Sequence, residues 1–300
     1  MSVPHANDRT VAVVGARSEI GQHLLPMLRD AGWQVRAISS RPPQGVGVAG
    51  IDWYRRDVAA QAFPQTRAWI FIAPIWIVPD WFDRMKAGGA HRVVAVSSTS
   101  VTTKTDSSTD AERRTVARLT QGETALRDWA QAQGVGWTVL RPTLIWGGGS
   151  DKNISDIARV ARRLGFLPMP GGGRGLRQPI HTADVAAACA GALHSDTASG
   201  HSYDIPGGET LSYAEMARRA CIAATGRARL LRLPVWSARA AIRAGRRLKG
   251  NTHWTPDMID RINRDMVFDA APAKRDLGHS PRGFAPVHSD VRRDVVRGER

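Results

Sequence analysis

Short apolar runs alternate with longer amphipathic stretches through the first 205 residues of this 300-residue chain. Apolar runs of this kind predict strands that are buried on both faces, and the stretches between them have the spacing of helices with one apolar side. Glycines at positions 32, 89 and 134 fall where three of these helices should end. The predicted strands are residues 10–15, 33–39, 51–57, 68–74, 91–98, 136–142 and 201–207.

This alternation predicts an α/β fold with a doubly wound parallel sheet, covered by helices on both faces. The sheet should occupy residues 1–150, and residues 177–207 should return to it. Residues 151–176 and 208–300 have a helical and less regular pattern. We therefore expect a smaller, mainly helical lobe after the main domain.

The turn after the first predicted strand reads VVGARSEIGQHL. Gly15 and Gly21 have the outer spacing of a dinucleotide-binding turn, while Ser18 stands where a middle glycine is usual. Glycines permit a tight turn and close helix packing, and the N-terminus of the following helix offers amide donors to a pyrophosphate. The pattern predicts a dinucleotide-binding Rossmann domain.

The end of the second predicted strand bears on the choice of cofactor. An acidic residue at this point binds the ribose hydroxyls of NAD, whereas an arginine accommodates the 2′-phosphate of NADP. The chain has Ser40 and Arg41 there and no acid, and Arg17 in the first turn is a second cation for the same phosphate. We expect NADP(H), with NAD as the alternative; the other interpretation is that both arginines are merely solvated.

The fifth predicted strand ends in hydroxyl side chains, in the sequence RVVAVSSTSV. Ser97, Ser98 and Thr99 end a central strand beside the expected ligand crevice, which favours a role in the site. The structural alternative is that these hydroxyls cap the strand and the following loop.

Several segments occur in the order found in the extended short-chain dehydrogenase/reductase family, which this chain resembles along almost its whole length. They are GARSEIG, Asp57 after the third strand, Ala73 and Pro74 after the fourth, VVAVSST, LRPTLIWGGG and RQPIHTADVA. The resemblance implies a nicotinamide cofactor and a C-terminal lobe that selects a small-molecule substrate. That lobe would comprise residues 151–176 and 208–300.

The same resemblance implies roles for individual residues. Thr99, with Ser98 beside it, would hydrogen-bond the reacting oxygen, and Ser97 would pack near the nicotinamide. Asp57 and Val58 would contact the adenine, and Ala73 and Pro74 would line the cofactor. Pro142 would lie near the nicotinamide.

The chain departs from the family at its acid–base pair, a tyrosine followed four residues later by a lysine. Its three tyrosines, at positions 54, 203 and 213, are followed at that spacing by Val58, Gly207 and Ala217. Anchored on Gly122 and Glu123, the tyrosine position becomes Thr115 and the lysine position Leu119. Neither side chain can replace the pair, because threonine is a far poorer proton donor and leucine carries no charge.

Three functions remain open. The first is an NADPH-dependent oxidoreductase, or an epimerase/dehydratase-like isomerase, whose proton comes from Thr99 with water, Lys104 or His181. The second is a regulator or accessory subunit that binds the cofactor without turnover. The third, hydrolysis by a Ser, His and Asp set, is disfavoured because the chain has no G-x-S-x-G elbow. We prefer the oxidoreductase.

Three residues are candidates for contact with the substrate. Trp76 and Trp146 are predicted on loops that border the crevice, together with Trp81, so a flat aromatic group could stack there. Arg177, in a glycine-flanked segment, aligns with an arginine that lies near the substrate phosphate in sugar-nucleotide members of the resembled family. We therefore expect a small molecule that is anionic or aromatic.

Net charge and composition indicate which other classes of partner, such as nucleic acid, membranes or metal ions, the chain could bind. The formal charge of +15 comes mostly from arginine spread along the chain, which indicates solvated faces rather than a nucleic-acid surface. The predicted basic helix at 237–250 leaves a weak peripheral membrane contact open. Cys189 and Cys221 lie in alanine-rich helical segments, and no cysteine, histidine and acid cluster has metal-ligand spacing.

The chain start has no apolar stretch of signal-peptide length, and the longest apolar run, 68–79, is too short to span a bilayer. We expect a cytoplasmic protein, either a monomer or a homodimer.

Overall fold

The computed structural model describes residues 9–43, 48–57, 63–103, 109–149, 154–238, 240 and 256–291. The chain divides into two compact units. The first unit comprises Met1–Thr143, Thr182–Ile205 and Asp269–Ser280, and the second comprises Leu144–His181, Pro206–Phe268 and Pro281–Arg300. It remains a prediction that the first unit binds the cofactor and that the second selects the substrate.

The first unit is built on a seven-stranded sheet in which every neighbouring pair is parallel. The strand order is β11-β6-β5-β4-β1-β2-β3. All seven predicted strands and the α/β class are confirmed. The strands are β1 (Thr10–Val14), β2 (Gln34–Ser39), β3 (Ile51–Arg55), β4 (Ala68–Phe71), β5 (Arg92–Val96), β6 (Gly136–Pro142) and β11 (His201–Ile205).

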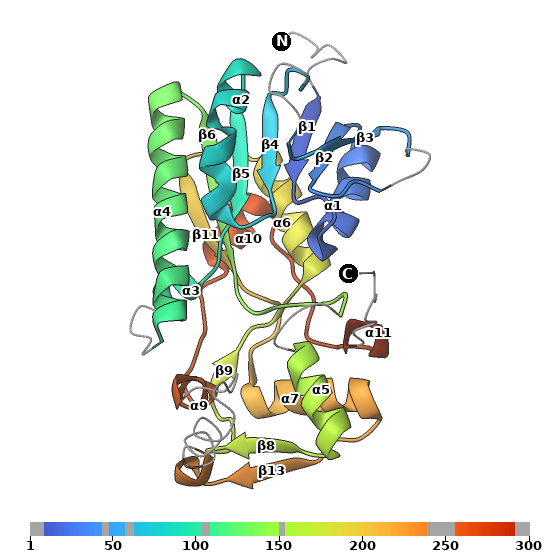
Figure 1. Ribbon diagram of the computed structural model, residues 1–300, viewed down its shortest axis with the longest axis vertical. Helices are drawn as coiled ribbons and strands as arrows, with labels where there is room; N and C mark the ends of the chain where they lie inside the picture. The colour runs from blue at the N-terminus through green and yellow to red at the C-terminus, as the bar shows by residue number, and fades with distance from the viewer. Residues whose placement is uncertain are drawn as a thin grey trace. The chain divides into compact units, whose positions relative to one another are not determined.

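Helices cover both faces of this sheet (Figure 1). The helices α1 (Glu19–Asp30) and α6 (Thr182–His194) pack together on one face, and η3 (Ile75–Trp81) packs with α4 (Asp110–Gln133) on the other. Gly122 permits the second contact, because a Cβ atom there would lie 3.0 Å from backbone atoms of Ile75. The unit also contains α2 (Phe82–Ala87), α3 (Ser100–Thr103), η4 (Asp196–Ala198) and α10 (Ala271–Leu277).

Aromatic side chains fill the core between the sheet and the η3–α4 layer. Trp69, Phe71 and Trp81 are fully buried, and the Trp69 and Trp81 ring centroids lie 5.9 Å apart. The expectation that Trp76 and Trp81 lie on a loop is wrong. The segment after Pro74 forms the 3-10 helix η3, because Ile75, Val78 and Trp81 recur at a helical spacing and bury one side.

The second unit packs helices against three short strand pairs. Its core includes Ile157 and Ala161 of α5 and Met216 and Ala220 of α7. The helices are α5 (Ile154–Leu164), α7 (Tyr213–Thr225), α9 (Pro256–Ile262) and α11 (His288–Val291). The strand pairs are β7 (Ile145–Trp146) with β10 (Ile180–His181), β9 (Leu176–Arg177) with β12 (Leu211–Ser212), and β8 (Leu167–Pro170) with β13 (Leu230–Leu233).

The two cysteines lie in helices, as the sequence indicates, and both are free and buried. Burial raises the pKa of the Cys189 thiol to about 12 and also raises the pKa of Cys221.

Within the described ranges, no helix is both long and apolar enough to cross a bilayer. The same residues contain no group of three or more His, Cys, Asp or Glu side chains that could hold a metal ion. Most of the predicted basic helix at 237–250 lies outside the described residues.

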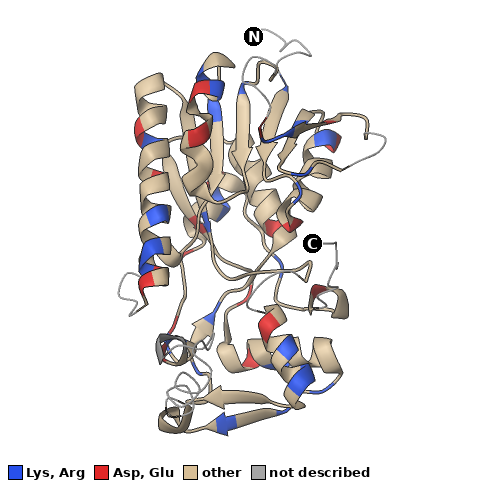
Figure 2. Ribbon diagram, in the orientation of Figure 1, with Lys and Arg blue, Asp and Glu red and all other residues tan. Residues whose placement is uncertain are grey.

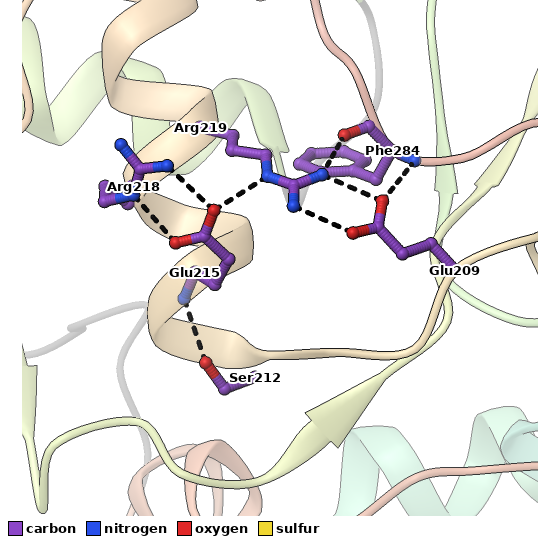
Figure 3. A network of polar contacts seen from close by, with 6 residues as sticks. All are labelled: Glu209, Ser212, Glu215, Arg218, Arg219 and Phe284. Atoms are coloured by element: carbon purple, nitrogen blue, oxygen red, sulfur yellow. Dashed lines mark hydrogen bonds and ion pairs between the residues drawn. The ribbon is translucent and has the colours of Figure 1, made fainter.

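A network of ion pairs stabilises the start of α7 (Figure 3). Ser212 caps the helix by accepting a hydrogen bond from the Glu215 amide, and the Glu215 carboxylate accepts from Arg218 and Arg219. Arg219 also pairs with Glu209 and donates to the carbonyl of Phe284. The hydrogen bond from Arg218, followed by that from Arg219, lowers the pKa of Glu215 to about 2.

We expect Glu215→Gln to lower the free energy of unfolding at neutral pH by roughly 1 kcal/mol, since the ion pairs are partly screened by solvent. A carboxyl with a depressed folded-state pKa contributes stability above its unfolded pKa and loses it as the pH falls through its folded pKa. The difference in the free energy of unfolding between the parent protein and the variant should therefore shrink as the pH falls from the ordinary carboxyl pKa of 4.5 to about 2. Denaturant unfolding at several pH values measures it. Asp156→Asn, which breaks an exposed pair with Arg159 on α5, is the control; equal losses for both variants would contradict the prediction.

Candidate functional site

The candidate site lies at the carboxyl ends of the parallel strands of the first unit. The strand order reverses between β1 and β4, so the loops that follow these two strands leave in opposite directions. Open α/β sheets bind ligands at such a switch point. Gly15 follows β1 there and Ala73 follows β4.

The two loops at the switch point approach each other closely. Gly15 has a φ of +91°, and a Cβ atom on it would lie 2.8 Å from the Ala73 amide nitrogen. A Cβ on Gly21 would lie 2.0 Å from the Ala16 carbonyl oxygen. Both glycines are therefore required by backbone packing. The Ser18 hydroxyl accepts a hydrogen bond from the Gly21 amide and caps α1, which leaves its proton available to a ligand.

Arg17 and Arg41 lie next to each other beyond the ends of β1 and β2. The Arg17 guanidinium donates to the Arg41 carbonyl at 2.8 Å, and the Arg41 amide donates to the Ser39 hydroxyl. Arg17, Ser40 and Arg41 are all exposed. The structure thus places the Arg17 guanidinium against the backbone of Arg41 near the end of β2, where the sequence offers no acid.

The predicted adenine contacts lie after β3. Asp57 is exposed and forms an ion pair with Arg55, whose hydrogen bond lowers the Asp57 pKa. Val58 lies outside the described residues. Pro74 is exposed and precedes η3, while Ala73 is half-buried beside Gly15.

The hydroxyl cluster after β5 is held by protein partners. The Thr99 hydroxyl and amide both donate to the carbonyl of Pro142, each at 3.2 Å, and Thr99 is buried. The Ser98 hydroxyl accepts from the Ser100 amide and donates to the Ser100 hydroxyl at the start of α3. These contacts match the capping alternative. The two roles are compatible, because a hydroxyl that caps a turn can still reorient toward a ligand.

A partly buried charge cluster, which was not predicted from the sequence, lies at this edge of the sheet. Glu123 of α4 accepts from the Ser97 hydroxyl and pairs with Arg141 of β6. Asp204 of β11 lies opposite Arg141 in the strand register. Burial, with the charge of Glu123 contributing, raises the pKa of Asp204, although Arg141 opposes the shift. One visible signal was an arginine inside the apolar strand GWTVLRP, because a cation there needs an acidic partner.

The positions aligned with the acid–base pair have no such chemistry. The Thr115 hydroxyl is exposed on α4 and donates to the Ala111 carbonyl. Leu119 belongs to the apolar core.

The candidate substrate residues occupy different surroundings. Trp76 is half-buried on η3, with the Arg118 guanidinium 4.2 Å from its ring centroid. Arg177 is buried in the second unit and donates to the carbonyls of Leu176, Arg261 and Arg264. Burial lowers its pKa.

Trp146 was predicted on a loop, and that placement is wrong. It ends strand β7 and is only 2% exposed, because the rings of His181 and Phe284 pack edge-on against it. It lines a cavity of about 530 Å³ within the second unit, together with Glu209 and Arg219. Its indole nitrogen is buried and has no hydrogen-bond partner among the described residues.

Glu123→Ala should lower the free energy of unfolding by about 2 kcal/mol, since it leaves the half-buried Arg141 guanidinium without its carboxylate partner. Glu123→Gln keeps an acceptor for Ser97 and should cost less. Asp128→Asn, which breaks an exposed pair with Arg127 on the same helix, is the matched control. Denaturant unfolding measures all three variants, and a loss for Glu123→Ala no larger than that of the control would refute a structural role for the cluster.

Solved structures with the same fold include those of sugar-nucleotide epimerases. UDP-N-acetylglucosamine 4-epimerase from Bacillus cereus is 16% identical, with a TM-score of 0.67 and 94% of each chain covered. UDP-glucose 4-epimerase from Thermotoga maritima, solved with UDP-glucose, is 15% identical, with a TM-score of 0.66 over 94% of this chain and 97% of that one. UDP-glucuronic acid 4-epimerase from Bacillus cereus, solved with NAD, is 13% identical, with a TM-score of 0.68 over 94% and 96%. At these identities the likeness shows the Rossmann-like fold alone.

One curated relative is a subunit of a respiratory complex. A segment of 82 residues is 37% identical to the mitochondrial NADH dehydrogenase [ubiquinone] 1 alpha subcomplex subunit 9 of Arabidopsis thaliana. The match spans 27% of this chain and only 20% of that protein.

The profile of the NAD(P)H-binding family matches residues 15–196, from the first glycine of the β1–α1 turn to beyond the end of α6. This range contains the switch point, the paired arginines and the hydroxyl cluster, and it spans more than half of the chain. The chain belongs to the NAD(P)H-binding family.

Proposed function

We propose that this protein binds NADP(H) and acts in the cytoplasm as an oxidoreductase on a small carbonyl or hydroxyl compound. The observation that carries the choice of NADP(H) is the contact between Arg17 and Arg41 at the end of β2. The contact holds the Arg17 guanidinium beside the Arg41 backbone, so the side chains of both arginines would be within reach of a 2′-phosphate, and residues 39–43 of the sequence offer no carboxylate for the ribose hydroxyls of NAD.

The residues of the switch point fit a dinucleotide. Gly15 and Gly21 bring the backbone close to where a pyrophosphate would bind, and α1 presents its positive end. Ser18 would donate to a phosphate oxygen, Arg17, Ser40 and Arg41 would bind the 2′-phosphate, and Ala73, Pro74, Ser97 and Pro142 would line the remaining cofactor contacts. When bound, the cofactor supplies or accepts a hydride.

In this proposal the protein's own contribution to the reaction is to bind and polarise the reacting oxygen. Thr99, with Ser98 beside it, would turn its hydroxyl from the Pro142 carbonyl to that oxygen. The 3.2 Å bond to Pro142 is long for a hydroxyl donor, so the exchange costs little. The half-buried pair of Glu123 and Arg141 would hold Ser97 and β6 in place during this exchange. Trp76, Trp146 and Arg177 stay as proposed substrate contacts, and Arg177 would have to release backbone carbonyls to bind an anion.

A second candidate function is cofactor binding without turnover, as a regulator or accessory subunit. Two observations favour it. Thr115 and Leu119 offer no acid–base group on α4, and the Thr99 hydroxyl is already bonded. The likeness of one segment to a respiratory-complex subunit is consistent with an accessory role.

For cofactor choice, calorimetric titration should give a lower Kd for NADPH than for NADH. Arg41→Ala should weaken NADPH binding by at least about tenfold, the value of one charge-assisted hydrogen bond, and leave NADH binding unchanged. Arg114→Ala, an exposed arginine on α4, is the control and should change neither Kd. Tighter binding of NADH by the parent protein would overturn the assignment to NADP(H).

Turnover separates the two functions. If the protein is an oxidoreductase, NADPH absorbance should decay with at least one member of a panel of aldehydes, ketones and quinones. Thr99→Val should then abolish the decay and leave the Kd of NADPH within about twofold, because the variant loses a polarising donor and keeps the shape. Saturable NADPH binding with no oxidation by any member of the panel would favour the regulator or accessory subunit.

A further inference from the structure

Exposed apolar side chains gather on one part of the second unit. In the described part of the chain, nine large apolar residues are at least 36% exposed. Four of them belong to the strand pair β8–β13 or to the residues next to it: Leu164, Phe166, Leu231 and Trp236. Trp236 is 73% exposed, more than any other in this group. We call these four residues the ribbon surface.

The strand register explains why one side of the pair remains uncovered. Leu230 lies opposite Leu167, and both pack toward the core of the second unit with Met169. Successive side chains of a strand point to opposite faces. Leu231, which lies opposite Pro168, therefore points away from that core. Phe166, just before β8, is also exposed. The exposed apolar side of this short sheet has no covering element among the described residues.

The charges around the ribbon surface have one sign. Arg163, Arg227, Arg229 and Arg232 flank it and are exposed. Figure 2 shows Lys and Arg on β13 and α5. Between Gly226 and Ser237 the sequence has three arginines and no Asp or Glu. A concentrated positive charge beside apolar side chains requires a partner that offers both negative charge and an apolar interior.

We propose that the ribbon surface binds the face of an anionic lipid bilayer. Phe166, Leu231 and Trp236 would enter the boundary between headgroups and acyl chains, where an aromatic ring with a polar edge is stable. The flanking arginines would reach lipid phosphates with their guanidinium groups while their methylene stems stay near the apolar layer. Nucleic acid would satisfy the arginines and leave the leucines and the aromatic rings in water. This inference is independent of the cofactor and of turnover.

The test is co-sedimentation of the full-length protein with vesicles. Vesicles of phosphatidylcholine with phosphatidylglycerol should bind the protein, and vesicles of phosphatidylcholine alone should bind it at least about tenfold more weakly. Leu231→Ser with Trp236→Ser should reduce binding to the anionic vesicles by about tenfold or more, because two apolar side chains leave the bilayer. Val267→Ser, at a 49% exposed position between α9 and α10, is the matched control and should bind as the parent does.

A second pair of variants separates this surface from the general positive charge of the chain. Arg229→Gln should weaken binding to the anionic vesicles by about fivefold, the value of one arginine near such a surface. Arg114→Gln removes the same charge from α4 in the first unit and should have little effect. Equal losses for the two arginine variants, no loss for the Leu231 and Trp236 variant, or no binding to anionic vesicles would each overturn the proposal. Binding to a DNA duplex without binding to vesicles would overturn it in favour of a purely electrostatic surface.

Discussion

The close approach of the β1 and β4 loops is the contact on which the candidate site depends. A parallel sheet puts all its strand ends at one edge, and the reversal of strand order between β1 and β4 separates their connections there. Gly15 can pass against the Ala73 amide only because it has no Cβ and can adopt a positive φ. The start of α1, the paired arginines and the loop after β5 are all placed relative to this contact by the register of the sheet.

A partly buried ion pair joins the elements at the same edge. Glu123 joins α4 to β6 through Arg141 and to the end of β5 through Ser97. Asp204 adds a second carboxylate on β11, and burial raises its pKa. The helix that would carry the acid–base pair of the resembled family thus keeps its attachment to the sheet and lacks the pair itself. The chain has the fold and the helix without this pair, so both proposed functions are compatible with the structure.

The second unit has a different organisation. Glu209, Glu215, Arg218 and Arg219 stabilise the start of α7, and Arg177 is bonded to backbone carbonyls. These groups are committed to structure. The uncommitted features are the exposed apolar side of the β8–β13 pair and the arginines that flank it, which led us to propose a bilayer as partner.

The sequence by itself determined the seven strands, their helices, the parallel α/β class and the glycine turn, because these follow from local periodicity and from residues with special backbone freedom. It also determined the absence of a tyrosine and lysine pair at the required spacing. Only the tertiary structure decided what the side chains touch. Trp81 and Trp146 are buried, and the Thr99 hydroxyl donates to the Pro142 carbonyl. Arg177 donates to carbonyls of residues more than eighty positions away. Glu123, Arg141 and Asp204 come from three separate elements, and their meeting depends on strand order and helix placement, which no local pattern encodes.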